Sequence, residues 1–127
     1  MFGFGGRTTA NAKLPKGVMA DGMLYLLSTQ KGRTINQAKL ANSWKRRYFV
    51  LHEEGRLLYF RSGKNGVGNH PKGGIMLNAD FFVADSLLRR HGFQISDFET
   101  TFYLGAESAA EMLTWMFKVG TLRAPPV

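Results

Sequence analysis

The sequence predicts a mainly β domain completed by one C-terminal α-helix, and three observations support this prediction. Short apolar runs recur from residue 21 onward and are separated by Gly, Asn, Asp and Ser, which favour turns between strands. Near the C-terminus the apolar spacing changes to a helical period. The chain has 127 residues, of which 44% are hydrophobic, and it contains no cysteine. These values indicate a single packed domain without disulfide bonds.

Seven segments are expected to form strands. Residues 1–20 have no apolar periodicity and are predicted to be a flexible N-terminal tail, after which residues 22–27 form the first strand. The later strands are expected at residues 44–51, 56–60, 74–77, 81–84, 93–96 and 101–104. Residues 28–43 are polar and residues 61–72 are rich in glycine, so both segments are predicted to be long loops.

Alternation sorts the side chains of residues 44–51 onto two faces, because successive side chains of a strand point to opposite sides of a sheet. One face is predicted to hold Lys45, Arg47, Phe49 and Leu51. The other is predicted to hold Trp44, Arg46, Tyr48 and Val50. Two of the three basic side chains of this strand should therefore point the same way.

The last part of the chain is predicted to be an amphipathic helix. Ser108 and Glu111 have the spacing of a capping box, in which the hydroxyl and the carboxylate each meet a free backbone N–H group. The helix should end near Gly120 and place four apolar side chains on one face: Met112, Trp115, Met116 and Val119. We expect this face to close an open end of the curled sheet. The domain is thus expected over residues 21–122, with 123–127 as a tail or the start of a linker.

The charge balance favours an anionic partner: nucleic acid, an acidic protein or the anionic face of a membrane. The formal net charge is +8, and it is uneven. Residues 1–60 contain ten basic and three acidic side chains, whereas residues 61–127 contain seven and six. Between residues 31 and 47 there are six basic residues and no acidic one: Lys31, Arg33, Lys39, Lys45, Arg46 and Arg47. They fit either a solvated basic loop or an anion-binding site.

Three stretches resemble the pleckstrin homology (PH) domain family. They are Gly22-Met23-Leu24, the strand pair formed by residues 44–51 and 57–60, and Trp115 within the C-terminal helix. The likeness covers residues 21–122. It implies a seven-stranded antiparallel barrel of two near-orthogonal sheets, capped by the amphipathic helix. It also implies a non-catalytic module for membrane targeting or protein docking.

The same resemblance implies which residues bind a ligand. Phosphoinositide-binding members grip the inositol phosphates with basic residues of the second strand and of the loop before it, and the string from Lys45 to Val50 fits their pattern. A strand can hold Arg47 for a two-pronged contact and Lys45 as a point charge. By similarity, the predicted phosphoinositide-binding residues are Lys31, Arg33, Lys45, Arg47, Tyr59 and Lys72, and Lys39 is a further candidate.

Two departures from the family pattern predict weak or promiscuous binding. Tight binders carry a Lys on the first strand, four residues after its opening Gly, and that position is Leu26 here. The loop between the sixth and seventh strands contains Asp97 and Glu99, which would repel phosphate if they faced the site. For several residues a simpler role stays open. Arg33, Lys39 and Arg46 could be solvated, and Tyr59 could be a packing residue.

Residues 86–91 form a second basic segment, and the sequence does not show where in the fold this segment lies. Leu87 and Leu88, next to Arg89 and Arg90, fit either an apolar tip that dips into a bilayer interface or a short packed turn, and the packed turn is favoured. Trp44 fits either the headgroup level of a membrane or half-buried packing.

Catalysis is not expected, because no nucleophile elbow, P-loop or paired carboxylates are present, and the three histidines lack metal-ligand spacing. No cofactor is expected. No apolar run approaches the ~20 residues of a membrane-spanning helix, and the start lacks a secretory signal. We expect a cytoplasmic signalling or adaptor module, monomeric as an isolated domain, that binds peripherally at the cytoplasmic face of membranes. The alternatives are a protein-interaction domain without a lipid and, from charge alone, a nucleic-acid-binding domain, which we disfavour.

Overall fold

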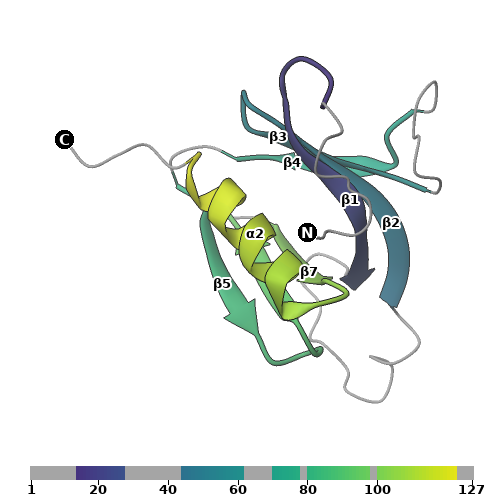
Figure 1. Ribbon diagram of the computed structural model, residues 1–127, viewed down its shortest axis with the longest axis vertical. Coiled ribbons are helices and arrows are strands. Elements are labelled where there is room, and N and C mark those ends of the chain that lie inside the picture. Colours follow the sequence, from purple (N-terminus) through teal and green to yellow (C-terminus); the bar gives the residue numbers. More distant parts are fainter. Residues whose placement is uncertain (1–13, 28–43, 62–69, 78–79, 98–99, 123–127) are drawn as a thin grey trace.

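Seven strands and one helix make up the described part of the chain. The computed structural model describes residues 14–27, 44–61, 70–77, 80–97 and 100–122 (Figure 1). In chain order the elements are β1 (Val18–Leu27), β2 (Trp44–His52), β3 (Arg56–Phe60), β4 (Gly73–Met76), β5 (Phe82–Ser86), β6 (Gly92–Ser96), β7 (Thr101–Gly105) and α2 (Ala109–Gly120). The predicted number of strands and the terminal helix are confirmed.

All strand pairs are antiparallel and belong to one sheet in the order β4-β3-β2-β1-β7-β6-β5. The two near-orthogonal sheets that the resemblance implies are therefore joined into one continuous sheet. They share β1, which pairs with β2 along its length and with β7 only near its end, at Tyr25 and Leu26. Figure 1 shows α2 lying across the concave side of this curled sheet.

The first strand begins earlier than the sequence predicts. β1 starts at Val18, so it includes residues that we assigned to the tail. Val18 pairs with His52, and the Glu53 N–H group donates to the Gly17 carbonyl at 2.8 Å. The register shifts between Val18 and Ala20, which marks a bulge. This extension depends on a partner more than thirty residues away, so local periodicity does not reveal it.

Several other strand ends also differ from the prediction by one or two residues. β4 occupies 73–76 rather than 74–77, and β5 occupies 82–86 rather than 81–84. β5 continues to Ser86 because Ser86 pairs with Gly92 at the start of β6. Residues 87–91 therefore form a turn between these two strands.

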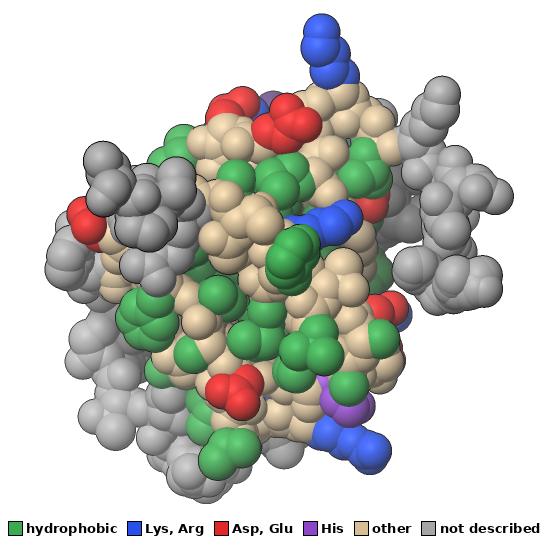
Figure 2. Space-filling model, turned by 60° about the vertical axis from the view of Figure 1, so that its left-hand side comes forward, with side chains coloured by type: hydrophobic (Ala, Val, Ile, Leu, Met, Phe, Trp, Pro, Cys, Tyr) green, Lys and Arg blue, Asp and Glu red, His purple; other side chains and the backbone are tan. Residues whose placement is uncertain are grey.

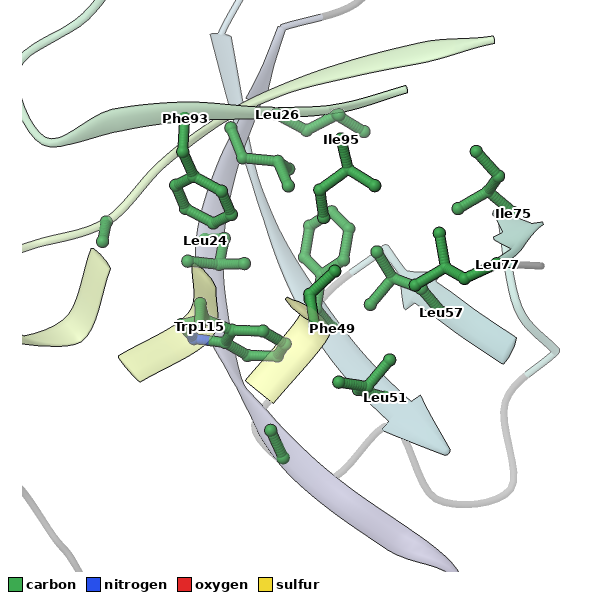
Figure 3. Packing of buried hydrophobic residues seen from close by; sticks show 14 of the residues in the cluster. Leu24, Leu26, Phe49, Leu51, Leu57, Ile75, Leu77, Phe93, Ile95 and Trp115 are labelled. Carbon is green, nitrogen blue, oxygen red and sulfur yellow. The ribbon is translucent and has the colours of Figure 1, made fainter. Parts of the chain in front are cut away.

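The core lies between the two halves of the sheet and the helix. Phe49, Leu51, Leu57, Phe93 and Ile95 are each completely buried. Figure 3 shows their side chains converging from different strands, with Trp115 of α2 reaching in beside Leu24. The predicted alternation of β2 is confirmed, since Phe49 and Leu51 both join this core.

The capping box of α2 forms with one difference. The Ser108 hydroxyl accepts from the Glu111 N–H at 3.1 Å, as predicted, but the Glu111 carboxylate accepts from the N–H of Glu107 rather than from that of Ser108. Trp115 and Val119 are buried, and Met112 and Met116 are partly buried against the core. The helix thus closes the sheet with the face that the spacing predicted.

Candidate anion-binding site at the mouth of the barrel

A cavity of about 190 Å³ opens where β1 ends and β2 begins. Its described lining consists of Leu26, Leu27, Lys45, Arg47, Tyr59, Lys72 and Phe102. Four of the six predicted site residues thus lie together. The other two, Lys31 and Arg33, lie outside the described residues, as does Lys39.

Lys45 and Arg47 reach this cavity because of the alternation of β2. They share a face with Phe49 and Leu51, which are buried. This face of β2 therefore lines the apolar core at one end and the cavity at the other. An Nη1 atom of Arg47 donates to the Arg61 carbonyl at 3.2 Å. This bond ties the guanidinium to the end of β3 and holds it at the rim of the cavity.

Tyr59 is held by its neighbours on three sides. Its ring centroid lies 5.4 Å from that of Phe49 and 5.9 Å from that of Phe102, the latter in an edge-on arrangement. On the third side is Gly73, its cross-strand partner. A Cβ atom at Gly73 would lie 2.7 Å from the Tyr59 hydroxyl oxygen, so only glycine leaves room for this ring position.

Lys72 is fixed through its backbone, since its N–H group donates to the Tyr59 carbonyl at 2.7 Å. Tyr59 therefore lines the cavity from β3, and Lys72 lines it from the position just before β4. Phe102, Leu27 and Gly73 were not predicted as part of this site. Their contributions depend on contacts between strands that are distant in the sequence.

The described lining of the cavity combines basic and apolar side chains. Its described lining includes three cations and no carboxylate. Leu26, at the position where tight binders carry Lys, is 8% exposed and packs in the core cluster. Such a lining favours a compact anion with several hydrogen-bond acceptors.

Asp97 does not line the described cavity. Its carboxylate accepts from the Thr100 N–H at 2.7 Å, and its own N–H donates to the Thr100 carbonyl, so it closes the turn between β6 and β7. Glu99, the second acidic residue of that loop, lies outside the described residues.

Arg46 points to the outer face of the sheet, as the alternation of β2 predicts. It forms an ion pair with Glu107 at 3.3 Å and lies 5.8 Å from the ring centroid of Tyr25. Of the three consecutive basic residues of β2, Arg46 is therefore a surface residue engaged outside the cavity.

The second basic segment packs on that same outer face. The Arg89 guanidinium lies 3.9 Å from the Tyr25 ring centroid and 5.2 Å from that of Trp44, which is cation–π geometry. A Cβ atom at Gly105 would lie only 2.6 Å from Arg89 Cδ, so this glycine lets the arginine lie flat. Trp44 is partly buried here, as its packing interpretation requires.

In the described ranges, no group of three or more His, Asp or Glu side chains is placed to hold a metal ion. Within the same ranges, no helix has both the length and the apolar character needed to span a membrane.

Comparison with known proteins gives concordant results. The family model described as "PH domain" matches residues 18–119. The mouse (Mus musculus) protein pleckstrin homology domain-containing family A member 2 is 27% identical over 95 residues, which cover 72% of this chain and 22% of the relative. This chain therefore matches only about a fifth of the length of that curated relative.

Several solved PH domains share the fold. The C-terminal PH domain of pleckstrin, in complex with D-myo-Ins(1,2,3,4,5)P5, has a TM-score of 0.64 at 23% identity over 84% of this chain and 99% of the other. The PH domain of human oxysterol binding protein-related protein 11 has a TM-score of 0.61 at 25% identity over 82% and 76%. The Slm1 PH domain, in complex with D-myo-inositol-4-phosphate, has a TM-score of 0.64 at 17% identity over 87% and 100%.

The sheet order, the capping helix and the family match agree over nearly the whole described chain. PH domains are generally binding modules rather than catalysts. This chain belongs to the PH domain family.

Proposed function

We propose that this domain binds the phosphorylated inositol headgroups of membrane lipids in the cavity at the mouth of the barrel. One observation above all supports the proposal. Lys45, Arg47 and Lys72 converge on one small cavity with the Tyr59 hydroxyl, and the described lining contains no carboxylate. A phosphorylated ring supplies the several negative charges and acceptor oxygens that such a set of donors requires.

Each residue has a distinct role in this proposal. Arg47 offers a planar set of donors whose orientation is set by the Arg61 carbonyl. Lys45 and Lys72 provide two further point charges. Tyr59 adds a neutral donor, held in place by Phe49, Phe102 and Gly73. Lys31 and Arg33 remain predicted contributors from the loop before β2.

Binding is proposed to be weak or tolerant of several headgroups. The apolar lining residues Leu26, Leu27 and Phe102 offer no charge to a phosphate. A basic residue near an anionic membrane surface contributes only ~1 kcal/mol. The domain would therefore bring its protein to the cytoplasmic face of membranes reversibly, as a non-catalytic, peripheral adaptor in signalling.

Two of the structural neighbours are consistent with this chemistry. The pleckstrin domain was solved with an inositol pentakisphosphate and the Slm1 domain with an inositol monophosphate. These ligands share a phosphorylated inositol ring and differ in the number of phosphates. The neighbours thus support the class of ligand.

A protein partner is the second candidate, and the outward face of α2 favours it. Leu113 is 59% exposed and Phe117 is 72% exposed, one helical turn apart. Figure 2, which looks onto the side of α2 and β5, shows hydrophobic side chains spread over this surface. Such a face is typical of a protein-interaction site.

Sedimentation with vesicles tests the headgroup proposal. We expect Lys45→Ala and Arg47→Ala each to reduce cosedimentation with phosphoinositide-containing vesicles several-fold. Arg56→Ala is the matched control, because it removes the same charge from the other end of β3, where Arg56 pairs with Glu54. Wild-type binding by both site variants would show that the cavity is not the headgroup site.

A further inference from the structure

The turn between β5 and β6 presents a leucine to solvent. Leu87 is 101% exposed, the largest exposed fraction of any large hydrophobic side chain in the described residues. Its neighbour Leu88 is partly buried. The packed-turn interpretation of this segment therefore holds for Leu88 and is wrong for Leu87.

The base of this turn is well fixed. Ser86 pairs with Gly92 across the two strands, and the Ser86 hydroxyl accepts from the Leu88 N–H at 3.3 Å. Arg89 is held against the rings of Tyr25 and Trp44. An exposed leucine on a loose loop would need no explanation, but here a bonded turn holds it outward.

The surroundings of Leu87 are basic. Arg89, Arg90 and His91 follow it, and Arg90 is exposed. Together with Leu87 and Met112 they line a shallow cavity of about 320 Å³, in which Asp85 is the one acidic residue. An apolar tip with basic flanks matches the interface of an anionic membrane, where acyl chains lie just below phosphate groups.

The turn lies near the proposed headgroup site. Arg89 contacts Trp44, and the next residue of β2 is Lys45, which lines the cavity at the mouth. Figure 1 shows the ends of β1 and β5 directed toward the same lower end of the molecule. The turn and the mouth therefore lie at the same end of the molecule, although Arg89 itself packs on the outer face of the sheet.

We propose that the β5–β6 turn is a second membrane contact, in which Leu87 enters the interface of an anionic bilayer and Arg90 meets the lipid phosphates. The inference rests on the proposed function, because the headgroup site would bring the turn to the membrane. The two contacts differ in chemistry. The cavity binds a headgroup that can also exist free in solution, whereas Leu87 requires a bilayer.

The absence of cysteine from the chain allows a direct test. We would place a single cysteine at position 87 (Leu87→Cys), attach an environment-sensitive fluorophore, and add phosphatidylcholine vesicles containing phosphatidylserine and a phosphatidylinositol bisphosphate. We expect a blue shift with these vesicles and none with soluble inositol phosphate. The matched control is Leu113→Cys on the exposed face of α2, where we expect no shift with either addition.

A second variant measures the contribution of the side chain. Leu87→Ser should weaken vesicle binding about tenfold, the loss expected when one partly inserted leucine no longer leaves water. It should leave the affinity for soluble inositol phosphate unchanged. Leu113→Ser should alter neither quantity.

The outcomes separate this proposal from the headgroup site. If vesicles bind in a manner that depends on Lys45 and Arg47 while the label at position 87 stays in water, the turn is not a membrane contact and the headgroup site stands. Absence of binding to both vesicles and soluble inositol phosphate would overturn the proposed function and this inference together. A label shift at both 87 and 113 would also overturn the inference, since contact would then not be specific to the turn.

Discussion

Tyr59 lies where it does because a residue on the neighbouring strand has no side chain. Gly73 faces the ring across the β3–β4 pair, and any Cβ there would overlap the hydroxyl oxygen and the adjacent ring carbons. Phe49 and Phe102 occupy other sides of the ring. In the proposed headgroup site, the hydroxyl would therefore be in position before a ligand arrives, which would lower the ordering cost of binding.

Replacing Gly73 should displace the hydroxyl. We expect Gly73→Ala to weaken binding of soluble inositol phosphate about tenfold, the effect of losing one hydrogen bond to a charged group. Tyr59→Phe should cause a similar loss. Titration calorimetry of both single variants and the double variant measures their coupling.

The double variant distinguishes positioning from general damage. If Gly73 acts through the Tyr59 hydroxyl, the double variant should bind about as well as Tyr59→Phe alone. Fully additive losses would contradict this role. Thermal unfolding of each variant checks that the fold persists.

At the scale of elements, β1 and β2 are joined by a side-chain bond as well as by their backbone ladder. The Tyr48 hydroxyl donates to the Asp21 carboxylate on the outer face of the sheet. Burial raises the pKa of the Tyr48 hydroxyl well above its ordinary value, and the bond and the charge of Asp21 raise it further. The folded state therefore holds this proton more tightly than the unfolded chain does.

This difference in pKa predicts a loss of stability at alkaline pH. The contribution of Tyr48 should be fully present below its unfolded pKa of about 10 and should decline as the pH rises above that value. Urea unfolding at about pH 8 and about pH 11 measures the difference. In Tyr48→Phe this part of the decline should be absent, and an unchanged decline would assign it to other groups.

The strands and the helix could be predicted from the sequence because their signals are local. Alternation in β2 placed Lys45 and Arg47 on the core face, and the spacing around Trp115 gave the buried face of α2. Long-range contacts were not accessible in this way. The start of β1 at Val18 depends on His52, and the position of Arg89 depends on Tyr25 and Trp44.

The strand pattern and the family resemblance together predicted part of the candidate site. Lys45, Arg47, Tyr59 and Lys72 do line one cavity. The sequence did not reveal that Gly73 makes room for Tyr59 or that the Arg61 carbonyl holds Arg47, because only the fold brings these residues together.

At the scale of the whole molecule, charge and shape make separate contributions to binding. The net charge of +8 attracts any anionic surface, and this attraction decays beyond ~8 Å at physiological ionic strength. Contacts of the proposed headgroup inside the cavity would be short and would be screened less.

Raised salt should therefore affect two ligands differently. We expect binding to vesicles with phosphatidylserine alone to be lost when the ionic strength is raised, while binding to soluble inositol phosphate falls less steeply. Sedimentation and calorimetry over the same salt series provide the comparison. Equal slopes would indicate diffuse attraction in place of a shaped site.

The bond between the Lys118 ammonium and the Met19 carbonyl, at 3.0 Å, has a consequence for where the two ends of the folded unit lie. It fastens the beginning of β1 to the last turn of α2, so the points of entry and exit of the folded unit are neighbours. Leu27 and Trp44, which flank the mouth, are at the other end of their strands. The unit therefore suits insertion into a surface loop of an unrelated host, because the host would be joined on the side remote from the mouth of the cavity.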